Sequence, residues 1–170
     1  MKLEIERKFL VTDDAWRRDA IACAELRQGY LANTAISSVR VRVAGTEGWL
    51  SVKAMRAGRS RHEFEYAIPL TDALALLGGF TEGAPVEKIR HRVPVGGHEF
   101  EVDEFQGANR GLVVAEVELE HAEEEFLRPR WLGDEVTDDA RYYNFRLAGE
   151  PFCDWPAELR ATVARGGRQP

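Results

Sequence analysis

One segment near the amino terminus reads Leu3-Glu4-Ile5-Glu6-Arg7-Lys8-Phe9-Leu10-Val11, and its charged and apolar side chains alternate with a period of two. This period is typical of a β-strand, so Glu4, Glu6 and Lys8 are predicted to share one face. Alternating charges usually mark the wet side of a strand, and that plain interpretation stays open for this segment alone. Two carboxylates and an ammonium group in one row would also suit a metal ion together with an anionic ligand.

The same alternation returns in later segments that are rich in β-branched and aromatic residues. They are residues 26–31, 38–43, 49–53, 61–68, 86–93, 99–105 and 112–120. Short turns join most of them, and the paired glycines Gly96 and Gly97 are typical of a two-residue hairpin. About eight short strands favour an α+β fold in which an antiparallel β-barrel closes on itself as a tunnel.

Helix signals lie between and after these strands. Capping oxygens at Thr12-Asp13-Asp14 predict a helix from Ala15 to about Cys23. Further helices are predicted over residues 71–77, 122–127 and 138–148, with a last short one after Pro156. The chain shows no repeat, low-complexity tract or linker, so its 170 residues are predicted to form a single domain, 1–170.

The charged faces of these strands must point either to bulk water or into the barrel. If they face water, the apolar faces fill a small barrel and leave the helices little to bury against. If they face inward, the helices pack outside and cover the apolar faces. Unpaired charges removed from water cost several kcal/mol each, so a charged interior requires water, ions and a charged ligand. On the pattern alone the two interpretations are about equally open.

The two signs of charge are sorted by strand. Carboxylates dominate the first and late strands, at Glu4, Glu6, Asp103, Glu116 and Glu118. Cations dominate the middle strands, at Arg40, Arg42, Lys53, Lys88 and Arg90. Carboxylate oxygens suit hard cations such as Mg²⁺ or Mn²⁺, while clustered Arg and Lys suit phosphate oxygens. A metal-bound polyphosphate would fit both halves.

Composition narrows the choice of partner and compartment. The formal net charge of −6 gives no global attraction for nucleic acid or for an anionic membrane, so any anion site must be local. The amino terminus carries no signal peptide and no segment is apolar enough to span a membrane, which predicts a cytoplasmic protein. Cys23 and Cys153 lack the spacing of a zinc site or a disulfide framework, and the four histidines lack metal-ligand spacing.

Glu4-Ile5-Glu6-Arg7-Lys8 resembles the E-x-E-x-K signature of the CYTH superfamily, also called the triphosphate tunnel metalloenzymes. Matching motifs follow in order along most of the chain. They are R-x-R at Arg40 and Arg42, Lys53 at a strand end, E-x-E at Glu63 and Glu65, K-x-R at Lys88 and Arg90, Asp103, and E-x-E at Glu116 and Glu118. Residues 27–31 and 135–144 also resemble short bacterial members of the family, except that Ala140 stands where these often carry a lysine.

The resemblance implies an eight-stranded tunnel that binds a triphosphate and requires Mg²⁺ or Mn²⁺. By this likeness Glu4, Glu6, Asp103, Glu116 and Glu118 would bind metal, and Lys8, Arg40, Arg42, Lys53, Lys88 and Arg90 would hold phosphate oxygens. Tyr30 would lie near one tunnel mouth, while Glu63 and Glu65 would order the basic residues or contact water around the metal. Glu4, Glu6, Lys8, Lys88 and Glu118 are the expected catalytic residues.

The expected reaction is metal-dependent hydrolysis of inorganic triphosphate (tripolyphosphate) to diphosphate and phosphate, with no protein nucleophile. One metal ion would bridge phosphate oxygens and a second would activate the attacking water. A class IV adenylyl cyclase, a nucleoside or thiamine triphosphatase, a non-catalytic polyphosphate-binding module and a purely structural barrel stay open as alternatives. The basic segment with Arg56, Arg59 and Arg61 could line a tunnel mouth or be solvated.

Overall fold

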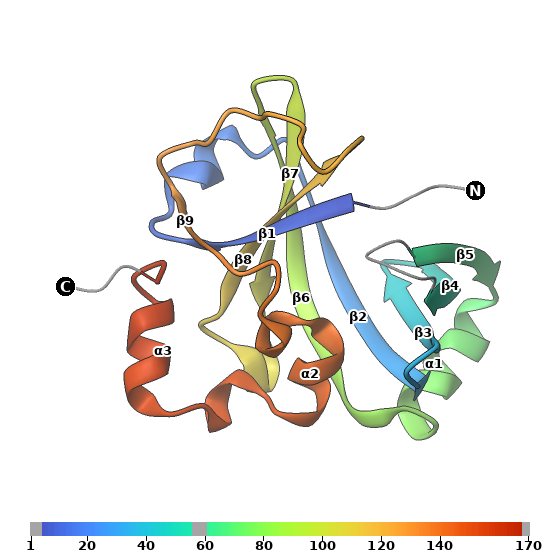
Figure 1. The fold of residues 1–170 in the computed structure, drawn as a ribbon. Coiled ribbons are helices and arrows are strands. Elements are labelled where there is room, and N and C mark those ends of the chain that lie inside the picture. Colours follow the sequence, from blue (N-terminus) through green and yellow to red (C-terminus); the bar gives the residue numbers. More distant parts are fainter. Residues whose placement is uncertain (1–4, 56–60, 168–170) are drawn as a thin grey trace.

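The computed structural model describes residues 5–55 and 61–167. Within these residues nine strands form one antiparallel sheet in the order β5-β4-β3-β2-β6-β7-β8-β1-β9 (Figure 1). The strands are β1 Ile5–Val11, β2 Ala22–Asn33, β3 Ser37–Ala44, β4 Glu47–Met55, β5 Arg61–Ile68, β6 Glu82–Val95, β7 His98–Phe105, β8 Val113–Leu119 and β9 Leu132–Glu135. The α-helices are α1 Leu70–Gly79, α2 Asn144–Gly149 and α3 Ala157–Val163.

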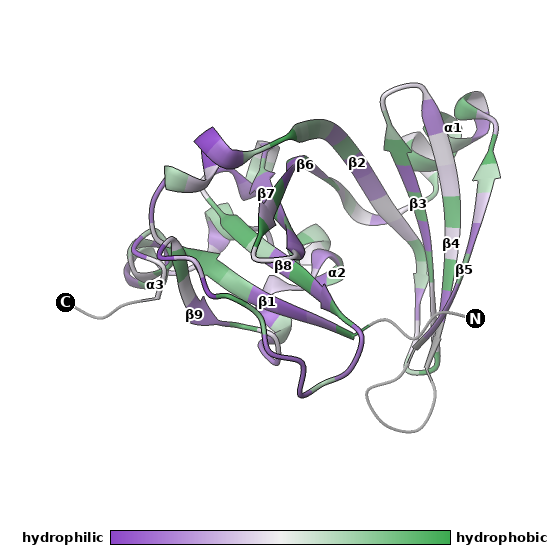
Figure 2. Cartoon of the chain, turned by 90° about the horizontal axis from the view of Figure 1, so that it is seen from above, coloured by the Kyte–Doolittle hydropathy of each residue, from purple (hydrophilic) through white to green (hydrophobic). Residues whose placement is uncertain are grey.

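The sheet is strongly curled. Viewed from above, the wall made of β3, β4 and β5 faces the wall made of β1, β7 and β8, and the long strands β2 and β6 join the two (Figure 2). The hairpin between β6 and β7 turns at Gly96 and Gly97, whose φ angles of 57° and 91° confirm the turn predicted from the paired glycines. The curl gives the sheet a concave inner face and a convex outer face.

The predicted antiparallel, tunnel-type sheet is confirmed, but its strand number and its closure differ from expectation. The described strands number nine rather than eight, and within the described residues β5 and β9 are the two edges of an open sheet. The sheet does not close on β5 because one edge of β1 pairs with β8 and the other edge pairs with β9, which follows residue 131. Val11 pairs with Leu132, and the Val136 N–H donates to the Lys8 carbonyl at 2.8 Å. This part of β1 therefore has no edge left for β5.

Apolar residues cover the convex face. One cluster packs Phe9 and Phe100 of the sheet against Trp16 and Trp131, which lie in connecting segments. A second packs Val41 of β3 against Ala73 and Leu77 of α1, so α1 lies outside the sheet as predicted. Burial of this apolar surface contributes roughly 25 cal/mol per Å² and holds the curl in place.

The carboxy-terminal elements take a different place. Leu10, Phe105 and Val114 point to the concave face, because each lies an even number of residues from Lys8, Asp103 or Glu116 on its strand. These three side chains share a buried cluster with Leu147 of α2 and Trp155. The carboxy-terminal segment therefore covers one end of the concave face and leaves the charged part beside it.

Two predicted helices are wrong, and one is divided. The segment expected to be helical up to Cys23 is a 3₁₀-helix at Ala15–Asp19, and β2 already begins at Ala22. Residues 122–127 form a turn and irregular structure. The helix predicted over 138–148 splits into a 3₁₀ turn at Ala140–Tyr142 and α2, whereas α3 confirms the short helix after Pro156. No helix in the described ranges is long and apolar enough to cross a membrane.

Candidate active site

The strand register places the predicted charged residues on the concave face. Directly opposed residues of neighbouring strands point to the same side, as Lys8 and Glu116 do, or Arg90 and Asp103. Following these pairs across the sheet puts one set of side chains on one face. Of the residues predicted for the site, this face holds Glu6, Lys8, Tyr30, Arg40, Arg42, Lys53, Glu63, Glu65, Lys88, Arg90, Asp103, Glu116 and Glu118. Glu4, Arg56 and Arg59 lie outside the described residues, and Arg61 begins β5.

A buried ion-pair network lies on the wall made of β1, β7 and β8 and on the adjoining strand β6. Lys8 forms a salt bridge with Glu116, and Lys88 forms one with Asp103. Arg90 joins the two pairs, because its Nη2 donates to Asp103 Oδ2 at 2.6 Å and to Glu116 Oε2 at 2.8 Å. Asp103 is fully buried and Lys8 and Lys88 are nearly so. Charges this deep are tolerated because each has an opposite partner.

The network changes the pKa values of its members. Burial alone would raise the pKa of Glu116, but the charges of Lys8, Arg90 and Lys88 outweigh it and lower the pKa well below its ordinary value. Burial works against the charged form of Lys8, yet Glu116 and Glu6 raise its pKa. For Lys88, burial and the neighbouring Arg90 lower the pKa despite Asp103. Lys8 and Glu116 therefore stay ionised at neutral pH.

The opposite wall carries a second set of ion pairs. Arg40 Nη2 lies 3.2 Å from Glu63 Oε1, and Arg42 Nη2 lies 2.9 Å from Glu65 Oε1. Lys53 Nζ is 3.4 Å from Glu63 Oε2, so Glu63 holds two cations. Burial and the adjacent charge of Arg40 lower the pKa of Arg42. Glu63 and Glu65 thus form ion pairs with the basic residues of this wall, and the two roles expected for them stay predictions.

Tyr30 lies between the two walls. Burial raises the pKa of its phenol, and the charges of Arg40, Lys53 and Lys8 oppose that rise. Its ring meets Phe145 of α2 edge-on, with 5.5 Å between centroids. Tyr30 therefore lies beside the carboxy-terminal cover and close to cations from both walls, and its predicted place near a tunnel mouth stays a prediction.

Three buried N–H donors on β2 and β3 have no acceptor within the part of the chain that the structure describes. They are Arg40 Nε, Arg42 Nε and Gln28 Nε2. Gln28 and Arg42 are directly opposed across β2 and β3, and Tyr30 is opposed to Arg40. Buried donors are normally paired, so a row of unpaired ones fits an anion with several acceptor oxygens. Gln28 was missed by sequence reasoning because an uncharged amide does not stand out in an alternating charge pattern.

The carboxylates fit a divalent cation in their chemistry. Glu6 and Glu118 are directly opposed on β1 and β8, and Lys8 Nζ lies 3.8 Å from Glu6 Oε1. No group of three His, Cys, Asp or Glu side chains suited to a metal was found among residues 5–55 and 61–167. Mg²⁺ is commonly held by one or two carboxylates together with phosphate oxygens and water, so two carboxylates would suffice beside a triphosphate.

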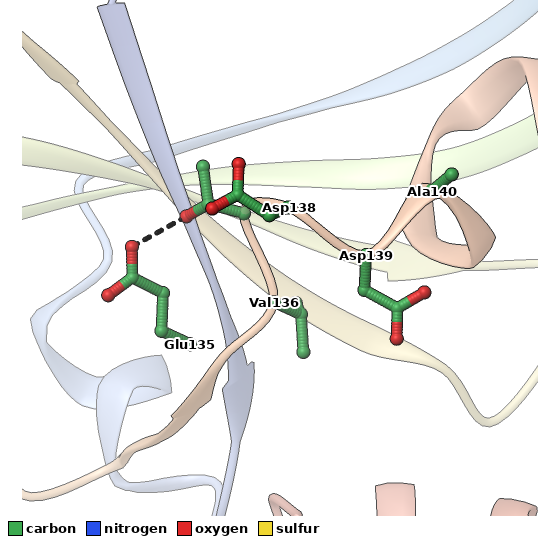
Figure 3. A pocket seen from close by; sticks show the side chains of 6 residues that line it. Glu135, Val136, Asp138, Asp139 and Ala140 are labelled. Carbon is green, nitrogen blue, oxygen red and sulfur yellow. Dashed lines mark hydrogen bonds between the residues drawn. The ribbon is translucent and has the colours of Figure 1, made fainter.

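A separate open cavity of about 670 Å³ lies at residues 135–140 and is acidic. Glu135 accepts a hydrogen bond from Thr137 Oγ1 at 2.7 Å, drawn in Figure 3, and another from Arg7 Nε at 2.9 Å. Asp139 forms an ion pair with Arg141. The predicted phosphate-binding cations do not line this cavity, so it does not fit a triphosphate.

The chain is similar in sequence to a known domain family and to two named proteins. Residues 2–144 match the CYTH domain family. A protein of Acetivibrio thermocellus named inorganic triphosphatase is 44% identical over 153 residues, which cover 89% of this chain and 97% of the relative. A protein of the same name from Nitrosomonas europaea is 41% identical over 150 residues, covering 85% and 96%.

Solved structures share the fold. A crystal structure of an inorganic triphosphatase superposes with a TM-score of 0.65 at 38% identity, covering 87% of this chain and 95% of the other. A protein of Pyrococcus horikoshii superposes with a TM-score of 0.55 at 20% identity, covering 70% and 79%, which shows the fold alone.

Proposed function

The chain belongs to the CYTH domain family, and from this premise we propose that it is a hydrolase that cleaves inorganic triphosphate to diphosphate and phosphate on its concave face. Two relatives that match nearly their whole length carry the name inorganic triphosphatase. The observation that carries the proposal is the row of buried donors at Gln28, Arg40 and Arg42, for which the described residues provide no acceptor. A chain of phosphate oxygens would satisfy all three.

The two walls would bind the triphosphate from opposite sides. Lys8 lies on one wall, and Lys88 and Arg90 lie on the adjoining strand β6. Arg40, Arg42 and Lys53 lie on the other wall. Charge-assisted hydrogen bonds from such groups to phosphate are about twice as strong as neutral ones. Because carboxylates hold most of these cations in position before substrate binds, little reorganisation is required during the reaction.

A divalent cation belongs to the proposal. Glu6 and Glu118 would hold it together with oxygens of the substrate, and the position of Glu4 two residues before Glu6 makes it a third candidate. A bound Mg²⁺ or Mn²⁺ would act as a Lewis acid on phosphate oxygens and make water a better nucleophile.

The protein side chains would then stabilise the charge that develops on the phosphate oxygens. Lys8 keeps its proton because Glu116 and Glu6 raise its pKa, so it can serve as a fixed positive charge. Arg90 is anchored by Asp103 at 2.6 Å and by Glu116 at 2.8 Å. Neither residue needs to gain or lose a proton in the reaction, which suits electrostatic stabilisation of an in-line attack by water.

One feature favours a substrate without a large organic group. The apolar cluster of Leu10, Phe105 and Val114 with Leu147 covers one end of the concave face. A phosphate chain beside it needs only the charged section, whereas an adenosine or thiazole group would need further room. Cyclase, nucleoside triphosphatase and thiamine triphosphatase activities are therefore the alternatives to test against.

The test is phosphate release from tripolyphosphate, ATP and thiamine triphosphate, measured side by side with Mg²⁺, with Mn²⁺ and with a chelator. We expect rapid metal-dependent release from tripolyphosphate and slow release from the other two. Cyclic AMP formed from ATP would instead establish a cyclase. Tight binding of tripolyphosphate without phosphate release under any condition would show that the protein is a non-catalytic binding module.

A further inference from the structure

Gln28 is a buried polar residue in the middle of β2. Its side chain is 1% exposed, and its amide nitrogen finds no acceptor in the described part of the chain. The strand register places it on the concave face, directly opposite Arg42 on β3 and Val86 on β6. An unpaired buried amide lowers stability, so a position used only for packing would favour an apolar side chain.

Asn109 provides a comparison within the same protein. It is 4% exposed, and both ends of its amide are used. Its Nδ2 donates to the Leu147 carbonyl at 3.3 Å, and its Oδ1 accepts from the Phe152 N–H at 2.8 Å. At this structural position both ends of a buried amide are satisfied, whereas the described residues offer no acceptor to the amide nitrogen of Gln28.

The surroundings of Gln28 favour a neutral donor over a charged one. Arg42 is its cross-strand neighbour, and burial together with the charge of Arg40 already lowers the pKa of Arg42. A third cation at position 28 would add to this repulsion. A glutamine amide adds an N–H donor beside the two guanidinium groups without adding charge.

We propose that Gln28 is a substrate-binding residue, whose amide N–H donates a hydrogen bond to a phosphate oxygen next to the oxygen bound by Arg42. This inference rests on the proposed function, because it names a further contact in the same site. It assigns a role to a residue outside the set of charged side chains. Affinity for tripolyphosphate then depends on the neutral amide of Gln28. In the protein without ligand, this unpaired amide lowers stability.

The experiment compares Gln28→Leu, which removes the donor at similar volume, with wild type and with Asn109→Leu. For Gln28→Leu we expect the KM for tripolyphosphate to rise about tenfold, the loss of one hydrogen bond to a charged acceptor, with a smaller change in kcat. Its melting temperature without ligand should be equal to wild type or higher. Asn109→Leu should lower the melting temperature and leave the KM unchanged.

A second measurement tests the binding of tripolyphosphate without depending on its hydrolysis. The rise in melting temperature on adding tripolyphosphate is measured in the presence of chelator, where only contacts with the protein contribute. Gln28→Leu should show a smaller rise than wild type, and Gln28→Glu, which places a negative charge against the phosphate, the smallest. If Gln28→Leu folds poorly, Gln28→Met serves in its place.

The outcomes separate this inference from the function itself. An unchanged KM and an unchanged ligand-induced shift in Gln28→Leu, with an active wild type, would overturn the role of Gln28 alone. A rise in KM of the same size in Asn109→Leu would overturn it as well, by showing that loss of stability explains the effect. A wild type that neither releases phosphate nor is stabilised by tripolyphosphate would overturn the proposed function.

Discussion

Lys8 and Glu116 are directly opposed on β1 and β8, and their buried side chains form a salt bridge. Arg90 forms a second salt bridge with Glu116. Burial penalises both charges, yet the pKa of Lys8 is raised and that of Glu116 is lowered, so each residue stabilises the charged form of the other. The pair connects the first strand to the network on β6 and β7. Its strength can be measured without any assumption about substrate.

A double-mutant cycle should reveal this coupling. Lys8→Met and Glu116→Gln are each expected to destabilise the protein, and the double variant should lose less than the sum, with a coupling free energy of about 1–3 kcal/mol from urea unfolding. The exposed pair of Arg92 and Glu99, with Nε and Oε1 2.6 Å apart, is the matched control. Its cycle should show much weaker coupling, because solvent screens it. Additive effects for Lys8 and Glu116 would contradict the network.

Glu135 should make a pH-dependent contribution to stability. The hydrogen bond from Arg7 lowers the pKa of Glu135 against the opposing effect of burial, and Thr137 lowers it further. A carboxyl whose pKa is lower in the folded state stabilises the fold above its unfolded pKa, about 4.3, and loses that effect as pH falls towards the folded value. The contribution should be below about 1 kcal/mol, because the group is partly exposed.

Glu135→Gln tests this expectation. The difference in urea midpoint between wild type and variant should be constant above about pH 5 and should shrink below about pH 4. The exposed Glu158→Gln, in the first turn of α3, serves as a control for removing one negative charge. A difference that grows on acidification would mean that the sign of the pKa shift is wrong.

Removing either carboxylate of the opposed pair Glu6 and Glu118 should impair metal use. We expect Glu6→Gln and Glu118→Gln to reduce turnover of tripolyphosphate by at least about tenfold and to raise the Mg²⁺ concentration needed for half-maximal rate. Without metal, Glu6→Gln should lower stability, because Glu6 Oε1 lies 3.8 Å from the buried Lys8 Nζ and favours its charged form. Full activity of both variants at low Mg²⁺ would reject these residues as ligands.

Arg40 should not be replaceable by lysine. Arg40→Lys keeps the charge but removes the buried Nε donor for which the described residues offer no acceptor. The ligand-induced rise in melting temperature with tripolyphosphate should therefore shrink, corresponding to about tenfold weaker binding. Arg92→Lys, at an exposed position near the hairpin end of β6 where Arg92 pairs with Glu99, should leave the rise unchanged. Equal effects of the two changes would indicate that charge alone matters.

Much of the site followed from the alternation of side chains. The pairs Arg40 with Arg42, Lys88 with Arg90 and Glu116 with Glu118 share a face because residues two apart on a strand must do so. The roles of the individual residues and the choice of metal remain predictions. The extent of the strands was underestimated, since β2 and β6 continue into stretches such as residues 82–85 that lack clear alternation.

The errors have local causes. Asp13 accepts a hydrogen bond from the Ala15 N–H at 2.8 Å, but the N-cap residue Asp14 makes no side-chain capping hydrogen bond. The 3₁₀-helix ends at Asp19, shortly before the long strand β2 begins at Ala22. The open edge of the sheet depends on β9, a four-residue segment, Leu132–Glu135, with no strand pattern of its own. Such short strands form through tertiary contacts, here with β1, and propensity alone does not indicate them.

Because β1 pairs only with strands from the second half of the described chain, it is among the last strands to be paired during synthesis. The buried side chain of Lys8 pairs with Glu116, which lies 108 residues later in the chain. The Lys8 N–H donates to Thr137, 129 residues later. Contacts of such long range slow folding, and a chain that emerges from the ribosome carries its first strand unpaired until β8 has been made. Until then the charged row of β1 stays in water, where its alternation helps to keep an unpaired strand soluble. The residues proposed to bind metal and phosphate would thus also protect the nascent chain.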